Sequence, residues 1–339
     1  MYKETVEYLK QINDIICCPK CAGNLNVGSD IIECVNCDQR YPIADNIPLL
    51  FWPNEWGPSK KDVTDIVKEF YEETPFPNYD NFDNVGSLIE KARQGVFARL
   101  LDDQIPHGAR ILECGCGTGQ LSNFLSVANR NVIGTDICLN SLKLAQKFKE
   151  ENQLKRVNFI QMNLFRPIFK PETFDLVISN GVLHHTADPF LGYKTISRLV
   201  KPNRYVIIGL YHKHGRIATD IRRIIFNISR DRFKFLDSRL RKKNLEEVRK
   251  NTWFADQYKN PHESKHTIRE VQSWFKKNGF EFVKSIPKTG LFATFDENER
   301  LFEAEKPSNW LESLISEFMM TFTASKEGGF FVVFGQKKS

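Results

Sequence analysis

After residue 60 the apolar positions of the chain follow two alternating patterns. Short apolar runs predict buried strands at residues 109–114, 131–135, 157–161, 174–179 and 205–210. Stretches between these runs, such as residues 120–127, place apolar residues three or four positions apart, which is the spacing of one helix face. Strands that alternate with helices in this way predict an α/β domain with a mostly parallel sheet.

The C-terminal part of the chain continues the pattern. Thr267 is the expected N-cap of a helix that ends at Gly279, and a strand is predicted directly after it, at residues 280–285. Another helix is expected over residues 310–322, and the last strand over residues 329–335.

The N-terminal part has a different kind of pattern, set by cysteines. Cys18 and Cys21 are separated by two residues, and so are Cys34 and Cys37. Two such pairs with a hairpin between them are typical of a zinc site, and four thiolates leave no open coordination position, so we expect a structural zinc ion. Cys17 is not an expected ligand because neighbouring side chains point in different directions. The alternative is a short hairpin with free cysteines.

The two patterns divide the chain into two expected domains. Residues 1–56 are predicted to form an N-terminal helix and a zinc ribbon. Residues 57–339 are predicted to form the α/β domain, with a helical insertion at about 211–262 and a second elaboration at about 288–326.

The composition indicates the class of protein, and the distribution of charge identifies one unusual segment. Of the 339 residues, 41% are hydrophobic and 27% are charged, as in an ordinary globular enzyme, and no apolar run is long enough to cross a bilayer. The N-terminus lacks the features of a signal peptide, so a cytoplasmic protein is expected. Cysteines clustered near one end also favour a metal site over a disulfide framework.

The formal net charge of +6 is concentrated in one segment. Residues 213–250 contain thirteen Lys or Arg and five Asp or Glu. Such a basic segment can face RNA, an anionic membrane surface or an acidic partner, or it can be a solvated helical insertion. Within it Ile217, Ile221, Ile224 and Ile225 recur at helical spacing. We expect this isoleucine face to cover the ligand cleft, with the arginines outward or toward an acidic group of the substrate.

A glycine-rich turn lies between the first predicted strand of the α/β domain and the helix after it. Its residues are Gly115, Cys116, Gly117, Thr118 and Gly119. Glycines at such a turn let the backbone approach a nucleotide-like ligand. The next strand ends at Asp136, whose carboxylate can accept hydrogen bonds from both hydroxyls of a ribose. Dinucleotide enzymes usually have a glycine one position later, where this chain has Gln120.

The order of these blocks resembles the class I S-adenosylmethionine-dependent methyltransferases, particularly the branch that contains ubiquinone and menaquinone C-methyltransferases. The resemblance covers residues 108–210 well. It implies a Rossmann-like sheet of seven mostly parallel strands that ends in a helix and an antiparallel hairpin. Residues 11–53, with the motifs at 15–21 and 40–50, resemble the small zinc-ribbon proteins that activate methyltransferases, which implies that the ribbon packs on the catalytic domain.

The resemblance also implies roles for individual residues in binding S-adenosylmethionine. Glu113 would hydrogen-bond around its amino group, Asp136 would hold its ribose and Ile137 would lie against its adenine. Asn163 stands where the family usually has an aspartate that accepts a hydrogen bond from the adenine amino group. The other expected contacts are Gly115, Cys116, Gly117, Thr118 and Gly119 around the methionine moiety, Leu164, Asn180 and Gly181 at two further strand ends, and Tyr71 in the aromatic stretch 70–79, which is either a cover for the cofactor or a packed linker.

A general base is required if an oxygen, nitrogen or carbon acid must lose a proton before it is methylated. The candidates are His184 and His185, which follow a predicted strand, and a polar cluster near the end of the insertion: Asp256, Tyr258, His262, Glu263 and His266. His262 and His266 could also form a metal pair, but Thr267 as an N-cap places them in a loop.

These observations leave three functional hypotheses. The first is a methyltransferase that acts on a small-molecule biosynthetic intermediate at carbon, oxygen or nitrogen. The second is an rRNA or tRNA methyltransferase that uses the ribbon and the basic insertion to bind RNA. The third is a non-catalytic cofactor-binding or activator protein. The isoleucine face and the scarcity of aromatic residues between the basic ones favour the first over the second, and the intact glycine loop argues against the third. No obligate protein partner is predicted.

Overall fold

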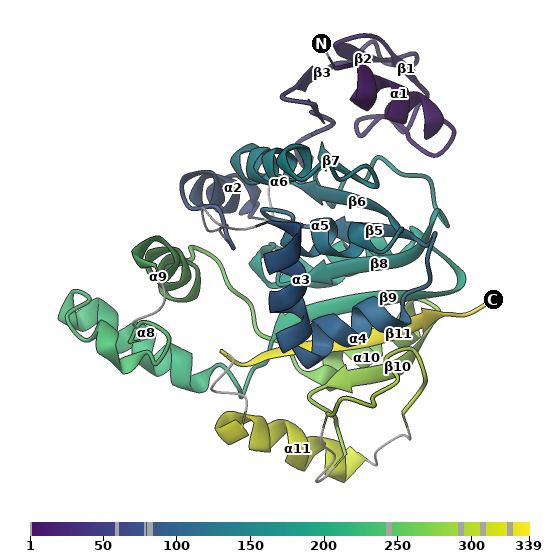
Figure 1. Ribbon diagram of the computed structural model, residues 1–339. Helices are drawn as coiled ribbons and strands as arrows, with labels where there is room; N and C mark the ends of the chain where they lie inside the picture. The colour runs from purple at the N-terminus through teal and green to yellow at the C-terminus, as the bar shows by residue number, and fades with distance from the viewer. Residues whose placement is uncertain are drawn as a thin grey trace.

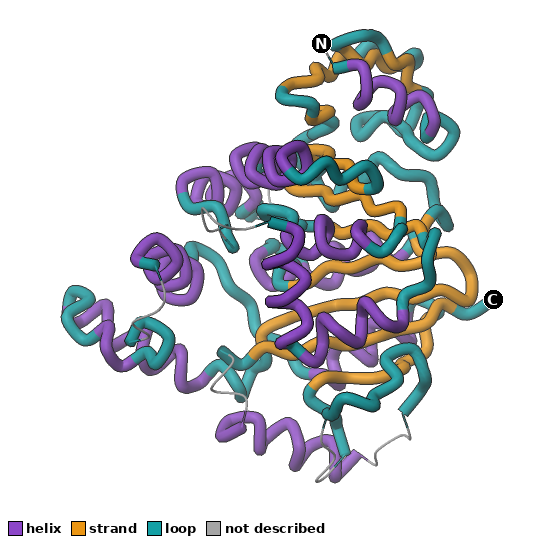
Figure 2. The backbone as a smooth tube through the Cα atoms, in the orientation of Figure 1, coloured by secondary structure: helices purple, strands orange, loops and turns teal. Residues whose placement is uncertain are grey.

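The computed structural model describes residues 2–57, 61–77, 79, 84–241, 246–290, 295–305, 310–323 and 328–339. Parts of the expected cover 70–79, of the basic segment 213–250 and of the elaboration 288–326 therefore lie outside the described residues. The described residues form a large sheet with helices on both faces and a small antiparallel sheet at the N-terminal end (Figures 1 and 2).

The large sheet contains seven strands in the order β10–β11–β9–β8–β5–β6–β7. The strands β5 to β9 run parallel to one another, whereas β11 runs antiparallel to both β9 and β10. This confirms the predicted fold class. The bounds are β5 Arg110–Cys114, β6 Asn131–Asp136, β7 Val157–Gln161, β8 Phe174–Asn180, β9 Val200–Tyr211, β10 Phe280–Ile286 and β11 Phe330–Lys337. β9 begins at Val200, before the predicted Tyr205. The sequence did not indicate this earlier start because the first residues of the strand are largely exposed and form no apolar run.

Both faces of the large sheet are buried, which explains why its strands have continuous apolar runs. Val206 and Ile208 of β9 pack in one core with Trp274, while Ile207 between them packs in a second core with Phe124. The helices are α1 Lys3–Gln11, α2 Thr64–Glu73, α3 Val85–Gln94, α4 Val96–Gln104, α5 Gln120–Val127, α6 Leu139–Glu151, α7 Pro189–Ser197, α8 Ile217–Ser229, α9 Glu247–Phe254, α10 Ile268–Lys277 and α11 Trp310–Thr323. Thr267 caps α10 by accepting a hydrogen bond from Glu270 N, and Gly279 comes after it with φ of 74°, as predicted.

The small sheet packs on the free edge of the large one. Its strands are β1 Leu25–Val27, β2 Ile31–Cys34, β3 Arg40–Ala44 and β4 Ile47–Pro48. Leu49 forms a parallel bridge to Gln161 of β7, and Ile16 forms an antiparallel bridge to Phe169. Apolar residues of the small sheet belong to the same core as Phe169. The ribbon is thus covered by the α/β domain, which hides apolar surface too large for so small a unit to bury alone.

The helical insertion comes after β9 and contains α8, the 3₁₀ turn η2 (Lys234–Leu236), α9 and the π-helical turn η3 (Ala255–Lys259). The predicted orientation of α8 is wrong. Ile217, Ile221 and Ile224 are exposed, and Ile225 is only half-buried. The buried residues of this helix are Thr219 and Phe226, and Phe226 packs against the rings of Phe254 and Tyr258 from α9 and η3.

The arginines of α8 likewise point inward, against the prediction. Arg223 donates to Glu263 Oε2 at 2.9 Å and to the carbonyl oxygen of Gln257 at 2.9 Å. The helix turns this side inward because Glu263, a buried carboxylate outside the insertion's own helices, needs cationic partners. Helical periodicity identified the two faces of α8 but could not show which face is buried.

Candidate functional site

A cavity of about 570 Å³ opens at the carboxyl ends of the parallel strands. Glu113 of β5 and Asn180 of β8 both line it, and the chain leaves these neighbouring strands in opposite directions across the sheet. This is the topological switch point at which open α/β sheets bind ligands. The volume lies within the range of small-molecule sites.

The glycine loop forms the floor of the cavity. Gly115, Gly117 and Gly119 have φ angles of 76°, 52° and 72°, which side chains rarely adopt. A Cβ atom on Gly117 would also lie 2.5 Å from the carbonyl oxygen of Phe76. The loop therefore requires glycine at this position for both conformation and space, and α5 begins directly behind it.

Two carboxylates lie at the strand ends beside the loop, Glu113 buried and Asp136 partly buried. Asp136 accepts hydrogen bonds from Gly117 N and Cys138 N, both at 2.8 Å, which fixes the carboxylate at the end of β6. Glu113 accepts a hydrogen bond from the Ser122 hydroxyl and makes no ion pair within the described part of the chain. Burial raises the pKa of Glu113 to about 8. A buried carboxylate without a cation suits the ammonium group of an amino-acid ligand.

The expected cover packs directly on the glycine loop. The Thr118 hydroxyl donates to the carbonyl oxygen of Pro77, and Tyr71, Phe76 and Pro77 line the cavity. Glu72 holds this segment in place by accepting hydrogen bonds from the first backbone N–H groups of α6. Asn78 of the expected cover lies outside the described residues.

Asn163 lines the cavity but is already engaged by the segment directly after the ribbon. Its amide donates to the carbonyl oxygen of Trp52 at 3.0 Å and to Asn54 Oδ1 at 2.9 Å, and its Oδ1 accepts from Phe165 N. The amide thus connects the wall of the cavity to the segment that follows the ribbon. The predicted contact of Asn163 with adenine stays a prediction.

The other end of the cavity is built by aromatic side chains and a small polar group. Tyr71, Phe76, Tyr211, Trp253 and Phe330 supply the aromatic walls. The polar group is His185, Asp256 and Gln257, and Arg239 lies with its guanidinium 4.0 Å from the centre of the Trp253 ring. We call this end the acceptor end, and the end at Glu113 and Asp136 the cofactor end.

The hydrogen bonds of His185 define its tautomer. Its Nδ1 lies 2.8 Å from the carbonyl oxygen of His262, and since a carbonyl oxygen can only accept, Nδ1 carries the proton. Nε2 is then the proton acceptor of the ring. Burial lowers the pKa of His185, so the ring is neutral near pH 7, and the nearby Asp256 opposes this effect. A neutral imidazole in a cavity can act as a general base.

Asp256 is positioned by neutral donors. Tyr71 donates to its Oδ1 at 2.8 Å and Gln257 donates to its Oδ2 at 2.8 Å. The π-helical turn η3 places these consecutive residues, Asp256 and Gln257, at the same cavity. Such turns are frequent at functional sites.

Of the candidate bases, the structure brings His185 and Asp256 to the cavity wall. His184 is fully buried and neither ring nitrogen has a hydrogen-bond partner among the described residues. Tyr258 donates to Asp237 at 2.7 Å, and Glu263 is ion-paired. His262 Nε2 bonds the carbonyl oxygen of Thr186, and His266 Nδ1 bonds Glu270. The side chains of Tyr258, His262, Glu263 and His266 are thus held by contacts outside the cavity.

The residues that sequence reasoning missed are Tyr211, Arg239, Trp253, Gln257 and Phe330. They come from β9, the insertion and β11, and no local spacing relates them. The aromatic residues near the ends of these segments were the feature of the sequence that could have indicated an aromatic wall.

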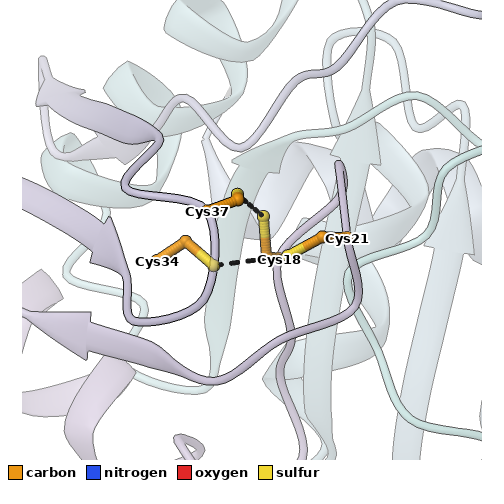
Figure 3. Close-up of side chains that lie close together, drawn as sticks. All are labelled: Cys18, Cys21, Cys34 and Cys37. Carbon is orange, nitrogen blue, oxygen red and sulfur yellow. Dashed lines mark hydrogen bonds between the residues drawn. The ribbon is translucent and has the colours of Figure 1, made fainter.

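Cys18, Cys21, Cys34 and Cys37 form the predicted cluster, with all four sulfur atoms within 4.8 Å of one another. Figure 3 shows the four side chains pointing toward a common centre. The Cys18–Cys37 and Cys21–Cys34 sulfur separations are 3.8 and 3.5 Å. A tetrahedral zinc ion with Zn–S bonds of about 2.3 Å places its sulfur ligands about 3.8 Å apart, so the cluster fits zinc. Cys17 lies outside it, as predicted.

Comparison with known proteins agrees with this description. Residues 112–208 match the model of a methyltransferase domain. An uncharacterised protein of Synechococcus sp. is 28% identical over 198 residues, which cover 51% of this chain and 48% of that protein. The ubiquinone biosynthesis O-methyltransferase of Leptothrix cholodnii is 29% identical over 110 residues, 32% of this chain and 47% of the relative. The chain thus spans about half the length of these curated relatives.

Among solved structures, PKMT2 of Rickettsia typhi is similar in fold, with a TM-score of 0.51 and 14% sequence identity over 77% of this chain and 56% of that one. Together with the glycine loop and the seven-stranded sheet, the domain match defines the class. The chain carries a class I, S-adenosylmethionine-dependent methyltransferase domain, and a four-cysteine cluster on a small antiparallel sheet precedes it.

Proposed function

We propose that the protein methylates a small molecule whose acceptor atom loses a proton to His185. The observation that carries this proposal is the His185 tautomer at the wall of the cavity, with Nε2 left as the acceptor. The aromatic walls around it suit a flat or apolar acceptor of small size.

S-adenosylmethionine fits the cofactor end. Glu113 would bind the ammonium group, Asp136 the ribose hydroxyls and the glycine loop the rest of the methionine moiety. Asn180 supports the fit because its buried Oδ1 has no hydrogen-bond partner among the described residues and the side chain lines the cavity. When bound, the cofactor supplies an electrophilic methyl group.

The chain's own residues then position the acceptor and accept its proton. Tyr71, Phe76 and Trp253 exclude water and restrict the orientation of the acceptor, which is where most of the rate of a displacement reaction can arise. His185 Nε2 accepts the proton, and the positive charge that forms on the ring is stabilised by Asp256. Tyr71 and Gln257 hold the Asp256 carboxylate in place.

Methyl transfer from radiolabelled S-adenosylmethionine tests the proposal. Purified protein is incubated with cell extract separated into small-molecule, RNA and protein fractions, and the label in each fraction is counted. We expect label in the small-molecule fraction. His185→Gln should reduce this transfer by about 100-fold or more, as loss of a general base does, while leaving cofactor affinity unchanged.

His107→Gln is the matched control, because His107 is exposed and does not line the cavity. Its transfer rate should equal that of the unmodified protein. Label in RNA, or a His185→Gln variant as active as the His107→Gln variant, would contradict the proposal.

A further inference from the structure

An exposed apolar stripe runs along α8. Ile217, Ile221, Ile224 and Ile228 succeed one another at intervals of four, three and four residues, so they share one face of the helix. Their side chains are 39, 54, 59 and 81% exposed. In a helix that packs on a domain, such a stripe normally faces the core. Here it faces outward, on an arm that projects from the side of the sheet (Figure 1).

The outward orientation is fixed by the contacts on the opposite side of the helix. Arg216, directly before α8, is fully buried and donates to both carboxylate oxygens of Glu263, at 2.9 and 2.6 Å. Arg223 bonds the same carboxylate, and Phe226 fills the small core of the insertion. Turning the isoleucines inward would break this buried ion pair, so rotation of the helix cannot hide them.

Exposed aromatic and aliphatic side chains continue the apolar surface beyond the helix. Phe233, Phe235 and Leu236 are each more than 40% exposed. The two phenylalanine rings contact each other, with centres 5.8 Å apart. At the other end, the ring of Phe318 on α11 lies 6.2 Å from that of His214, just before α8. We call Ile217, Ile221, Ile224, Ile228, Phe233, Phe235 and Leu236 the α8 surface.

The charge around the α8 surface is positive. Lys213, Arg230, Arg232, Lys234 and Arg241 are exposed and lie within or beside it. Among the described residues, none of these five side chains forms an ion pair with a carboxylate.

The three acidic residues between Lys213 and Arg241 are all engaged by other groups. Asp220 is paired with Lys265 and Asp231 with Lys259. Asp237 is buried and accepts hydrogen bonds from Trp253 and Tyr258. The free charge that this surface offers to a partner is therefore cationic.

We infer that the α8 surface docks the protein on an anionic membrane surface. The apolar stripe matches the acyl boundary of such a membrane, and the arginines and lysines beside it match the anionic headgroups. A second copy of the chain would bring the same unpaired cations against each other, which opposes a symmetric dimer. RNA would match the charge but would leave an aliphatic stripe in contact with phosphates instead of stacked bases.

Docking in this orientation has a consequence for the acceptor end. Arg239 and Trp253 line the cavity and belong to the same insertion as the α8 surface. An apolar acceptor dissolved in the membrane would therefore enter the cavity near its point of docking. This consequence rests on the proposed function, whereas the docking itself does not.

Co-sedimentation of the full-length protein with lipid vesicles tests the inference without requiring activity. Vesicles of phosphatidylcholine with phosphatidylglycerol are compared with vesicles of phosphatidylcholine alone, over a range of salt concentrations. We expect binding to the anionic vesicles that weakens with salt as the headgroup attraction is screened. Arg230→Gln with Arg232→Gln should weaken it about thirtyfold at low salt, since each cation contributes about a fivefold gain near such a surface.

The apolar contribution is tested separately. Ile224→Ser with Ile228→Ser should weaken binding to anionic vesicles about tenfold or more, because two exposed isoleucines no longer insert. Val35→Ser is the matched control, since Val35 is 68% exposed but lies in the ribbon, and its binding should be unchanged. Absence of binding to anionic vesicles would overturn the inference. So would a concentration-dependent dimer that the isoleucine substitutions dissociate, or RNA binding at physiological salt that the arginine substitutions abolish.

Discussion

The two ends of the cavity are built in different ways. The cofactor end is made from short segments at strand ends, such as Glu113 to Gly119 and Asp136 to Ile137, and the hydrogen bond from Gly117 N to Asp136 connects two adjacent strand ends. The acceptor end joins Tyr71, His185 and Asp256 from three distant parts of the chain through side-chain contacts. One end is thus fixed by backbone geometry and the other by a network of buried polar side chains.

This difference indicates which end can change without the other. Parallel strands and glycine turns position the cofactor end whatever segment is attached after β9. The acceptor end depends on the insertion, which is held by Arg216 and Glu263 and closes over the cavity through η3. An insertion of this kind can be reshaped around a new acceptor while the cofactor end stays intact.

The largest expected effect is on the insertion. Glu263→Gln leaves Arg216 buried without a counter-ion, which should lower the free energy of unfolding by about 3–5 kcal/mol. Urea titration measures this change. The affinity of the folded variant for S-adenosylhomocysteine should stay within about threefold of that of the unmodified protein, because Glu263 does not line the cavity.

Glu281→Gln provides the comparison, since the Glu281–Lys338 pair is exposed at the surface and should contribute less than about 1 kcal/mol. If Glu263→Gln were as mild as Glu281→Gln, the insertion would not be held by its buried ion pair.

The next effect concerns the cofactor end alone. Asp136→Ala removes the carboxylate at the end of β6 and should weaken binding of S-adenosylhomocysteine by about 100-fold, because two hydroxyls would lose a charged acceptor. Isothermal calorimetry measures it. Asp103→Ala, at an exposed aspartate on α4, should bind normally. Normal binding by a folded Asp136→Ala variant would mean that the nucleoside does not lie at the end of β6.

A smaller, pH-dependent effect is expected at Glu113. The pKa of about 8 in the free protein means that the carboxyl is largely protonated at pH 6 to 7. An ammonium group favours the ionised form and lowers the pKa, so binding of S-adenosylhomocysteine releases a proton below pH 8. Affinity should therefore rise between about pH 6 and pH 8, by at most tenfold per pH unit.

Glu113→Gln removes this titration and should bind more weakly with a flat profile between pH 6 and pH 8. Calorimetry over that range distinguishes the two proteins. A wild-type affinity that falls with increasing pH would contradict an ammonium group beside Glu113.

The smallest effect is expected at the acceptor end. The Asp256 carboxylate raises the pKa of His185 against the lowering caused by burial, so Asp256→Asn should lower the pKa of His185 further. Titration of the His185 ring by NMR in the free protein would detect this shift. A raised pKa in the variant would show that Asp256 does not act on the ring through its charge.

The sequence predicted the cofactor end far better than the acceptor end. Gly115 to Gly119, Asp136 and the four zinc-site cysteines lie in contiguous motifs whose spacing has a local physical cause. Thr267 and Gly279 similarly defined α10 by the chemistry of helix ends. In all these cases the residues that define the structure are neighbours in the chain.

The acceptor end could not be predicted in the same way. His262, Glu263 and His266 were grouped as candidates because they are close in sequence, but the structure distributes them among three separate contacts. The predicted inward face of α8 was wrong because the buried carboxylate of Glu263, far along the chain, pairs with arginines on the other side of the helix. Tyr71 reaches Asp256 across 185 positions, and no periodicity in the sequence relates them.

A crystal structure with S-adenosylhomocysteine would show directly whether the cavity has these two ends. We expect the ribose hydroxyls on Asp136, the amino group on Glu113 and the sulfur atom facing His185 across the cavity. The acceptor end, with Tyr71, Trp253 and Asp256, should remain open beside that sulfur. A ligand bound elsewhere, or one whose sulfur faces away from His185, would contradict the division of the cavity into a cofactor end and an acceptor end.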